Sequence, residues 1–204
     1  MIPTVLDQVE QARRIRALAE SESNKRDEVW DGLYQVSPSP NDEHQEVVAN
    51  LIMIFGVSVA WSGLGLVRPE VNVSDRVAQW EHNFRCPDVV VYLRGTAARN
   101  LGTHWVGGPD FGVEVISRDD RSREKLAFYA AVGTRELLLV DRYPWTLELY
   151  RLAGGVLQLA GISSPDRPDW LLSEVLPLGF RLVVGEPRPV IEVAHSDGVQ
   201  RWSA

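Results

Sequence analysis

Two short apolar runs that each contain one acidic residue place the strongest constraint on how this chain can fold. Residues 86–93 (CPDVVVYL) carry Asp88, and residues 111–117 (FGVEVIS) carry Glu114. A third run, residues 135–141, is almost uniformly apolar, which is typical of a strand covered on both faces of its sheet. An ionised carboxylate in such a sheet is costly unless a cation or hydrogen-bond donors compensate its charge. The pattern therefore predicts a buried sheet that contains an unusual pair of acids.

Helices are expected on both sides of these strands. Residues 43–55 have apolar side chains at helical spacing, and Asn41 or Asp42 is suited to cap the helix. Residues 121–132 form a second expected helix, and Gly133 is suited to end it. The alternation of helices and strands predicts an α/β fold in which a mixed central β-sheet is flanked by helices.

The 204 residues suffice for one domain with a sizeable core. Within a single domain, 1–204, we expect an N-terminal helical extension over 1–24 and a core over 25–152. Residues 170–193 alternate short apolar runs with Pro and Gly, and we expect 153–204 to form a C-terminal extension of added strands.

Composition excludes several classes of protein. A single cysteine excludes an internal disulfide and a multi-cysteine zinc site. The longest apolar run, residues 47–60, is too short and too interrupted to span a bilayer, and the N-terminus lacks the pattern of a signal peptide. We therefore expect a cytoplasmic protein with no membrane contact. The net charge of −7 argues against a general nucleic-acid-coating protein but not against a nuclease, whose metal-binding carboxylates add negative charge.

The two acids suggest a shared cation. If their strands pair near these positions, Asp88 and Glu114 point into one groove. Hard divalent cations such as Mg²⁺ or Mn²⁺ take carboxylate, carbonyl and water oxygens, and they can activate water for attack on a phosphoryl group. The alternative is that each acid lies near a strand end and pairs with an arginine, such as Arg85 or Arg118.

Lys125 is a candidate third member of this site. Only two of the 21 basic residues are lysines, and Lys125 follows the Glu114 strand at the start of the expected helix. A helix packed back on the sheet could bring its ammonium group beside the carboxylates, where it could orient water or stabilise developing charge. The alternative is a solvated lysine on the helix surface.

The chain resembles the family of putative restriction endonucleases called the Uma-two type, a branch of the PD-(D/E)xK nuclease superfamily. The matching segments cover roughly residues 25–152, and their order and spacing carry the resemblance more than any one motif does. They are 28–40 (EVWDGLYQVSPSP), 43–45 (EHQ), 86–91 (CPDVVV), 108–117 (GPDFGVEVIS), 125–130 (KLAFYA) and 133–141 (GTRELLLVD).

That resemblance implies a restriction-endonuclease-like αβββαβ core. It carries metal-ligand roles onto Asp88, Glu114 and the backbone carbonyl of Val115, and it implies a DNA substrate and a homodimer. The sequence departs from the superfamily pattern at Ile116, where the lysine of the E-x-K motif would stand. In this branch the lysine is thought to have moved to the following helix, which here means Lys125.

Other polar residues have weaker claims. Asp110 follows a proline as in the letters PD, but on a strand it would lie about 13 Å from Glu114, too far for one cation to bridge. Glu28 and Glu46 could be outer ligands, although a surface position is favoured for Glu46. His44 could contact a phosphate or support the start of its helix.

Three functions are compatible with these residues. The first is a metal-dependent endonuclease that cleaves phosphodiester bonds of DNA with a metal-activated water. The second is a catalytically inactive protein of the same fold that acts as an oligomeric nucleic-acid- or protein-binding module. The third is a phosphoesterase for small molecules, which would need a narrow pocket rather than an open cleft.

Overall fold

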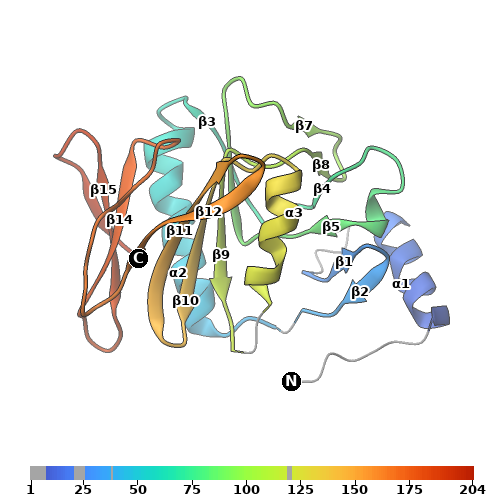
Figure 1. Cartoon of the computed structure of the whole chain (residues 1–204), viewed down its shortest axis with the longest axis horizontal. Helices are drawn as coiled ribbons and strands as arrows, with labels where there is room; N and C mark the ends of the chain where they lie inside the picture. Colours follow the sequence, from blue (N-terminus) through green and yellow to red (C-terminus); the bar gives the residue numbers. More distant parts are fainter. Residues whose placement is uncertain (1–7, 21–25, 38, 119–120) are drawn as a thin grey trace.

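A computed structural model describes residues 8–20, 26–37, 39–118 and 121–204. Three sheets follow one another across the molecule, with the N-terminal elements at one side and the C-terminal strands at the other (Figure 1). None of the described helices is long and apolar enough to cross a membrane.

The central sheet is mixed and has the strand order β12-β11-β10-β9-β6-β3. Strand β6 is antiparallel to its neighbours β3 and β9, whereas β9 and β10 run parallel and are connected by a helical segment. With the preceding helix α2 this is the expected αβββαβ core. The strand bounds are β3 Gly65–Pro69, β6 Val89–Leu93, β9 Phe111–Ile116, β10 Glu136–Arg142, β11 Trp145–Ala153 and β12 Val156–Ser163.

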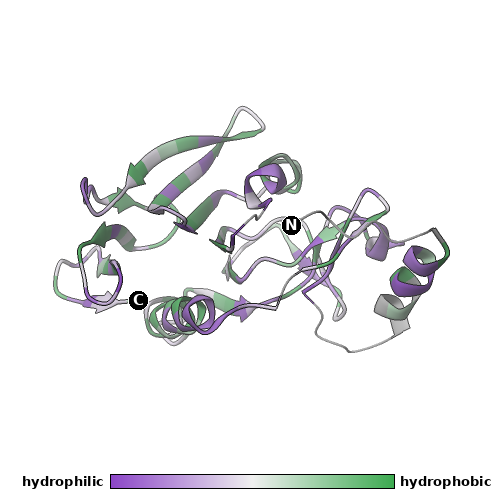
Figure 2. Cartoon of the chain, turned by 90° about the horizontal axis from the view of Figure 1, so that it is seen from below, coloured by the Kyte–Doolittle hydropathy of each residue, from purple (hydrophilic) through white to green (hydrophobic). Residues whose placement is uncertain are grey.

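Helices cover both faces of this sheet, which explains why its inner strands are apolar throughout. α2 (Asp42–Phe55) lies on one face and α3 (Leu126–Ala131) on the other, as the view from below shows (Figure 2). Asn41 caps α2 by accepting the His44 N–H, and Gly133 follows α3 with a positive φ of 85°. Alternate residues of β9 therefore face different helices.

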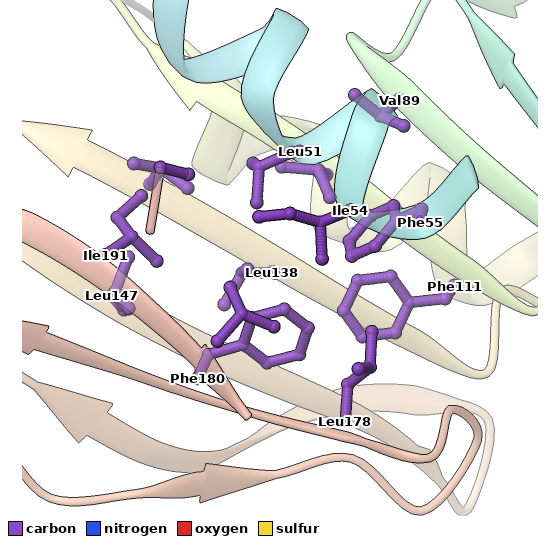
Figure 3. Close-up of a cluster of buried hydrophobic side chains, with 14 of the residues drawn as sticks. Leu51, Ile54, Phe55, Val89, Phe111, Leu138, Leu147, Leu178, Phe180 and Ile191 are labelled. Atoms are coloured by element: carbon purple, nitrogen blue, oxygen red, sulfur yellow. The ribbon is translucent and has the colours of Figure 1, made fainter. Parts of the chain in front are cut away.

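The main core lies between α2, the central sheet and the C-terminal strands. Figure 3 shows Leu51 and Phe55 of α2 packed near Phe111 of β9 and Phe180 of the C-terminal sheet. The rings of Phe55 and Phe111 pack edge to face with their centroids 5.8 Å apart, which is a favourable geometry for two aromatic rings. A smaller core on the other face contains Ile116, Phe128 and Tyr129 together with Leu137 and Leu139.

A second sheet precedes and interrupts the central one in sequence. Its order is β2-β1-β5-β4-β8-β7, and α1 (Gln8–Glu20) packs beside it. Asp31 and Gly32 connect β1 to β2, and both have positive φ, as a two-residue hairpin turn requires. The strands are β1 Glu28–Trp30, β2 Leu33–Gln35, β4 Val73–Ser74, β5 Phe84–Arg85, β7 Arg99–Asn100 and β8 Trp105–Val106.

The C-terminal strands form a third, antiparallel sheet that covers the main core. It comprises β13 Leu171–Leu172, β14 Leu178–Val183, β15 Val190–His195 and β16 Arg201–Ser203. The central sheet itself continues through β12, beyond residue 152. Short helical turns complete the fold at η1 Gly56–Ala60, η2 Trp80–His82 and η3 Ser122–Lys125.

Several elements are shorter than the sequence pattern predicts. β6 begins at Val89 because Pro87 has no N–H to continue the ladder, so Asp88 lies just before the strand. The sequence pattern from Leu64 to Val73 favours one continuous strand, but the structure divides it at Glu70, whose φ of 49° turns the chain. Residues 122–125 form a 3₁₀ turn ahead of α3 instead of its first α-helical turn, a common start for a helix.

Candidate active site at the junction of two sheets

The two predicted acids lie on neighbouring strands of the central sheet. β6 and β9 pair antiparallel, with Val89 opposite Val113. Asp88 comes one residue before Val89 and Glu114 one residue after Val113, and Asp88 Oδ2 accepts the Val115 N–H at 2.8 Å, so the two acids lie close together. Both acids are buried, with exposed fractions of 7% and 4%. The predicted pairing of the two strands is therefore confirmed, and it brings both acids to one end of the sheet.

Glu114 contacts a lysine and a tyrosine. It occupies the face of β9 that α3 covers, so the segment from η3 into α3 lies directly over it. Lys125 Nζ lies 3.1 and 3.0 Å from the two Glu114 oxygens, and the Tyr129 hydroxyl donates a short hydrogen bond to Oε1. Lys125 therefore reaches the site from the following helical turn.

Glu28, contributed by the second sheet, completes this group. Its Oε1 lies 2.9 Å from Lys125 Nζ and accepts the backbone N–H of Cys86 at 2.9 Å. Its Oε2 accepts the indole N–H of Trp30 at 2.7 Å. Glu28, Glu114, Lys125 and Tyr129 form what we call the Lys125 cluster, in which one ammonium group joins carboxylates from two sheets.

Asp88 belongs to an adjacent group. Its Oδ2 accepts the Val115 N–H at 2.8 Å, and its Oδ1 lies 3.0 Å from His44 Nε2 and 3.4 Å from Arg26 Nη1. Arg26 also forms a short ion pair with Glu70. Arg26, His44, Glu70 and Asp88 form what we call the Arg26 cluster, which adjoins the Lys125 cluster through Glu114 and Val115.

Negative charge exceeds positive charge across the two clusters. They contain four carboxylates, from Glu28, Glu70, Asp88 and Glu114, whereas the described residues bring two permanently charged cations into ion-pair contact with them, Arg26 and Lys125. Arg85 is buried nearby and adds a positive charge, yet its hydrogen bonds go to backbone carbonyls and an amide.

This imbalance is reflected in the protonation of Glu114. Burial raises the pKa of Glu114 to about 8; Lys125 opposes this rise, while the charges of Glu28 and Asp88 add to it. The raised pKa means that the surroundings of Glu114 compensate its ionised form poorly. An additional cation nearby would stabilise that ionised form. The site therefore has the electrostatic character of a cation-binding centre.

The donor atoms fit a hard divalent cation that keeps part of its water shell. Within the described residues, no group of three or more His, Cys, Asp or Glu side chains is arranged as a complete metal cage. Mg²⁺ is usually held by one or two carboxylates together with waters. Asp88 and Glu114 supply carboxylate oxygens of this kind. Zinc and other softer metals, which prefer sulfur and nitrogen ligands, fit this site less well.

The structure separates the other candidate residues. Asp110 lies before the start of β9, where its carboxylate accepts the Leu93 N–H at 2.8 Å and pairs with Arg135 at 3.2 Å. Glu46 is an exposed acid paired with Arg188, outside both clusters. His44 and Glu28, by contrast, are buried members of the site.

Position 116 could not supply the lysine of this site. Ile116 is buried in the small core beneath α3, with Phe128 and Leu139 among its neighbours. A charged side chain there would lose this packing and face apolar surroundings. The ammonium group instead comes from Lys125.

Three residues of the site were not found by sequence reasoning. Arg26 and Glu70 are far apart in the chain, in segments without a distinctive pattern, so only the fold brings them to Asp88. Tyr129 had a usable signal, because it follows Lys125 by four residues and therefore shares its face of the helical segment.

Arg118, Arg121 and Arg123 lie in the segment between β9 and α3, and the last two are paired with acids. Arg121 pairs with Glu124, and Arg123 pairs with Asp141 and Glu148. Arg118 is exposed and packs its guanidinium group over the ring of Tyr143 at 5.1 Å. The surface beside the site therefore carries scattered arginines rather than a continuous positive band.

Comparisons with known proteins agree with this architecture. A family model described as "Putative restriction endonuclease", Uma2, matches residues 9–185. The fold is similar to the crystal structure of a putative nuclease of the DUF820 family from Anabaena variabilis, with a TM-score of 0.61. That match has 16% identity and covers 79% of this chain and 90% of the other. A search of curated proteins finds no match.

Proposed function

This chain belongs to the Uma2 family of putative restriction endonucleases, and we propose that it is a metal-dependent endonuclease that cleaves phosphodiester bonds of DNA. The observation that carries the proposal is the buried pair Asp88 and Glu114, held on adjacent strands with Lys125 Nζ about 3 Å from Glu114. Two buried acids beside a lysine are the parts that metal-assisted phosphoryl transfer uses.

Asp88, Glu114 and the carbonyl of Val115 would hold Mg²⁺ or Mn²⁺. The Val115 N–H points to Asp88, and the N–H and C=O of a strand residue are directed to the same neighbouring strand. The Val115 carbonyl is therefore directed toward the Asp88 side of β9. When bound, the cation would lower the pKa of a water and polarise the phosphoryl group.

Lys125 has two roles in the proposed reaction. Its ammonium group is fixed by Glu28 and Glu114 at 2.9–3.1 Å, so it presents a positioned charge without reorganisation. From there it orients the attacking water and stabilises the negative charge that develops on the phosphate. Tyr129 and Trp30 support this geometry because each donates a hydrogen bond to one of the two carboxylates.

Within this proposal the substrate is DNA and the working form is a homodimer. Cleavage of both strands of a duplex needs two centres, which a twofold pair of subunits would supply. The family description supports a nucleic-acid substrate.

The test is cleavage of supercoiled plasmid DNA with Mg²⁺, Mn²⁺ or EDTA present. We expect nicking that requires the divalent cation and falls by about 1,000-fold in Asp88→Ala and Glu114→Ala, because each removes a ligand of the charged centre. Glu46→Gln, which changes an exposed acid outside the site, is the matched control. Full activity in both alanine variants would contradict the proposal.

A second candidate function is a catalytically inactive binding module of the same fold. It is favoured by the position of Lys125, whose ammonium group already contacts both Glu28 and Glu114. This function predicts no Mn²⁺ binding by calorimetry and no cleavage of any nucleic acid. A Mn²⁺ affinity that disappears in Glu114→Gln would exclude it.

A further inference from the structure

The two clusters hold their carboxylates with different strength. In the Lys125 cluster, Nζ lies at 2.9–3.1 Å from three carboxylate oxygens of Glu28 and Glu114. In the Arg26 cluster, the guanidinium group forms a short ion pair with Glu70, but its Nη1 stays 3.4 Å from Asp88 Oδ1. A charge-assisted N–H···O bond normally measures about 2.7–2.9 Å, so the contact between Arg26 and Asp88 is a loose one.

Arg26 is anchored independently of Asp88. Besides Glu70, its guanidinium group donates to Gln45 Oε1 at 3.3 Å. Its Nη1 also lies 3.1 Å from His44 Nε2, a nitrogen that either accepts from Arg26 or donates to Asp88 but cannot do both. The arginine can therefore lose its contact with Asp88 and keep its other partners. Its side chain is 17% exposed, compared with 10% for Asp88, so it lies toward the solvent side of the acid.

Among the residues that the structure describes, Arg26 is the permanently charged cation in direct contact with Asp88. One of its oxygens is occupied by the Val115 N–H, and the other is shared by His44 and Arg26. A cation that binds Asp88 would meet the guanidinium charge close by, and like charges at such distances repel strongly in a partly buried site.

We propose that Arg26 is an exchangeable counter-cation, which neutralises Asp88 in the metal-free protein and which a divalent cation displaces toward Glu70. This inference rests on the proposed metal-binding role of Asp88 and adds a competing residue to it. Lys125 does not exchange in this way, because its ammonium group contacts three carboxylate oxygens of two residues at 2.9–3.1 Å. Arg26 therefore lowers the affinity of the site for metal.

The test is the affinity of the full-length protein for Mn²⁺, measured by calorimetry in wild type and in Arg26→Gln. We expect Arg26→Gln to bind Mn²⁺ about tenfold more tightly, because the competing charge is gone. Arg181→Gln is the matched control. It removes one arginine of an ion pair with Glu192 in the C-terminal sheet and changes the net charge equally.

Circular dichroism melting in EDTA checks that Arg26→Gln is folded. If Arg26→Gln is not folded, Arg26→Lys is used instead, because a lysine cannot span Glu70 and Asp88 as a guanidinium group does. We expect Arg26→Lys to bind Mn²⁺ about threefold more tightly than wild type.

Each outcome decides the inference. Unchanged or weaker Mn²⁺ binding in the Arg26 variant would show that Arg26 orients Asp88 instead of competing for it. An equal gain in Arg181→Gln would assign the effect to net charge and overturn the inference as well. Either result leaves the proposed function intact provided that wild type binds Mn²⁺. Absence of Mn²⁺ binding in both wild type and Arg26→Gln would remove both proposals.

Discussion

One buried acid, Asp110, lies just before β9, and another, Glu114, lies toward its far end. The two acids differ in how their charge is compensated. Asp110, just before the strand, is 6% exposed, and Glu114, within it, is 4% exposed. Asp110 accepts a backbone N–H from Leu93 and pairs with Arg135, with no second carboxylate in contact. Glu114 shares its lysine with Glu28 and has Asp88 across the strand pair.

Burial alone therefore does not identify a functional acid. The environment of Asp110 satisfies one carboxylate with one donor and one cation, as a structural residue requires. The environment of Glu114 concentrates several acids around too few cations, which is unfavourable for folding and suited to binding a cation. What distinguishes the two ends is the balance of charge around each acid.

The largest effect is expected at Lys125, the cation that contacts Glu114. We expect Lys125→Met to reduce plasmid cleavage by about 100-fold, because the positioned charge at the reacting phosphate is lost. Arg123→Gln, which changes a cation two residues earlier on the same turn, should cleave within about threefold of wild type. Initial rates at saturating Mg²⁺ measure both, and equal loss in the two variants would contradict a specific role for Lys125.

The pH dependence of stability should also separate the two acids. Because the pKa of Glu114 is raised from 4.5 to about 8 in the folded protein, the folded state retains a proton that the unfolded state releases. The contribution of this group is fully present below pH 4.5 and is lost as the pH rises through about 8.

We therefore expect the free energy of unfolding in EDTA to fall between pH 5 and pH 9 in wild type. The fall should be smaller in Glu114→Gln, which has no proton to lose, and unchanged in Asp110→Asn. Urea unfolding across this range measures the three slopes. The same slope in wild type and Glu114→Gln would show that another group is responsible.

Removing the carboxylate charge should lower the free energy of unfolding more at Asp110 than at Glu114. Asp110→Asn should cost about 1–3 kcal/mol, because it weakens the acceptor of the Leu93 N–H and breaks the pair with Arg135. Glu114→Gln should cost less at pH 9 in EDTA, because it removes a charge that its surroundings compensate poorly. Unfolding by urea tests both, and a larger loss in Glu114→Gln would reverse the comparison.

The smallest effect is expected at Arg135. Its side chain is 54% exposed, so Arg135→Gln should cost less than about 1 kcal/mol, and high salt should reduce the difference. Denaturation at low and at high salt checks this. A loss as large as that of Asp110→Asn would mean that the ion pair, not the Leu93 N–H, satisfies Asp110.

Much of the fold follows from local patterns along the chain. The apolar strands around Asp88 and Glu114, the amphipathic pattern of α2 with its Asn41 cap, and the turn at Asp31 each report a local preference that the structure keeps. The αβββαβ order is confirmed because helix and strand periodicity are set by neighbouring residues. The division of the chain into an extension, a core and added strands stays a prediction.

Element ends were less predictable than element types. Asp88 lies outside β6 because of Pro87, and the strand predicted to reach Val73 ends where Glu70 adopts a left-handed backbone. Both features depend on ladder partners that are distant in sequence. The choice of Asp88 over Asp110 as a metal ligand stays a prediction, although their surroundings differ as that choice requires.

By itself the sequence determined that two acids lie in or next to apolar strands of a buried sheet, and that a scarce lysine follows one of them. Only the tertiary structure decided which charges meet them. Glu28 lies on a strand of another sheet, Glu70 lies in the turn after β3, and Arg26 lies just before β1. Electrostatic balance depends on the positions of charges in space, and no local pattern in the chain encodes which distant side chains will share a buried site.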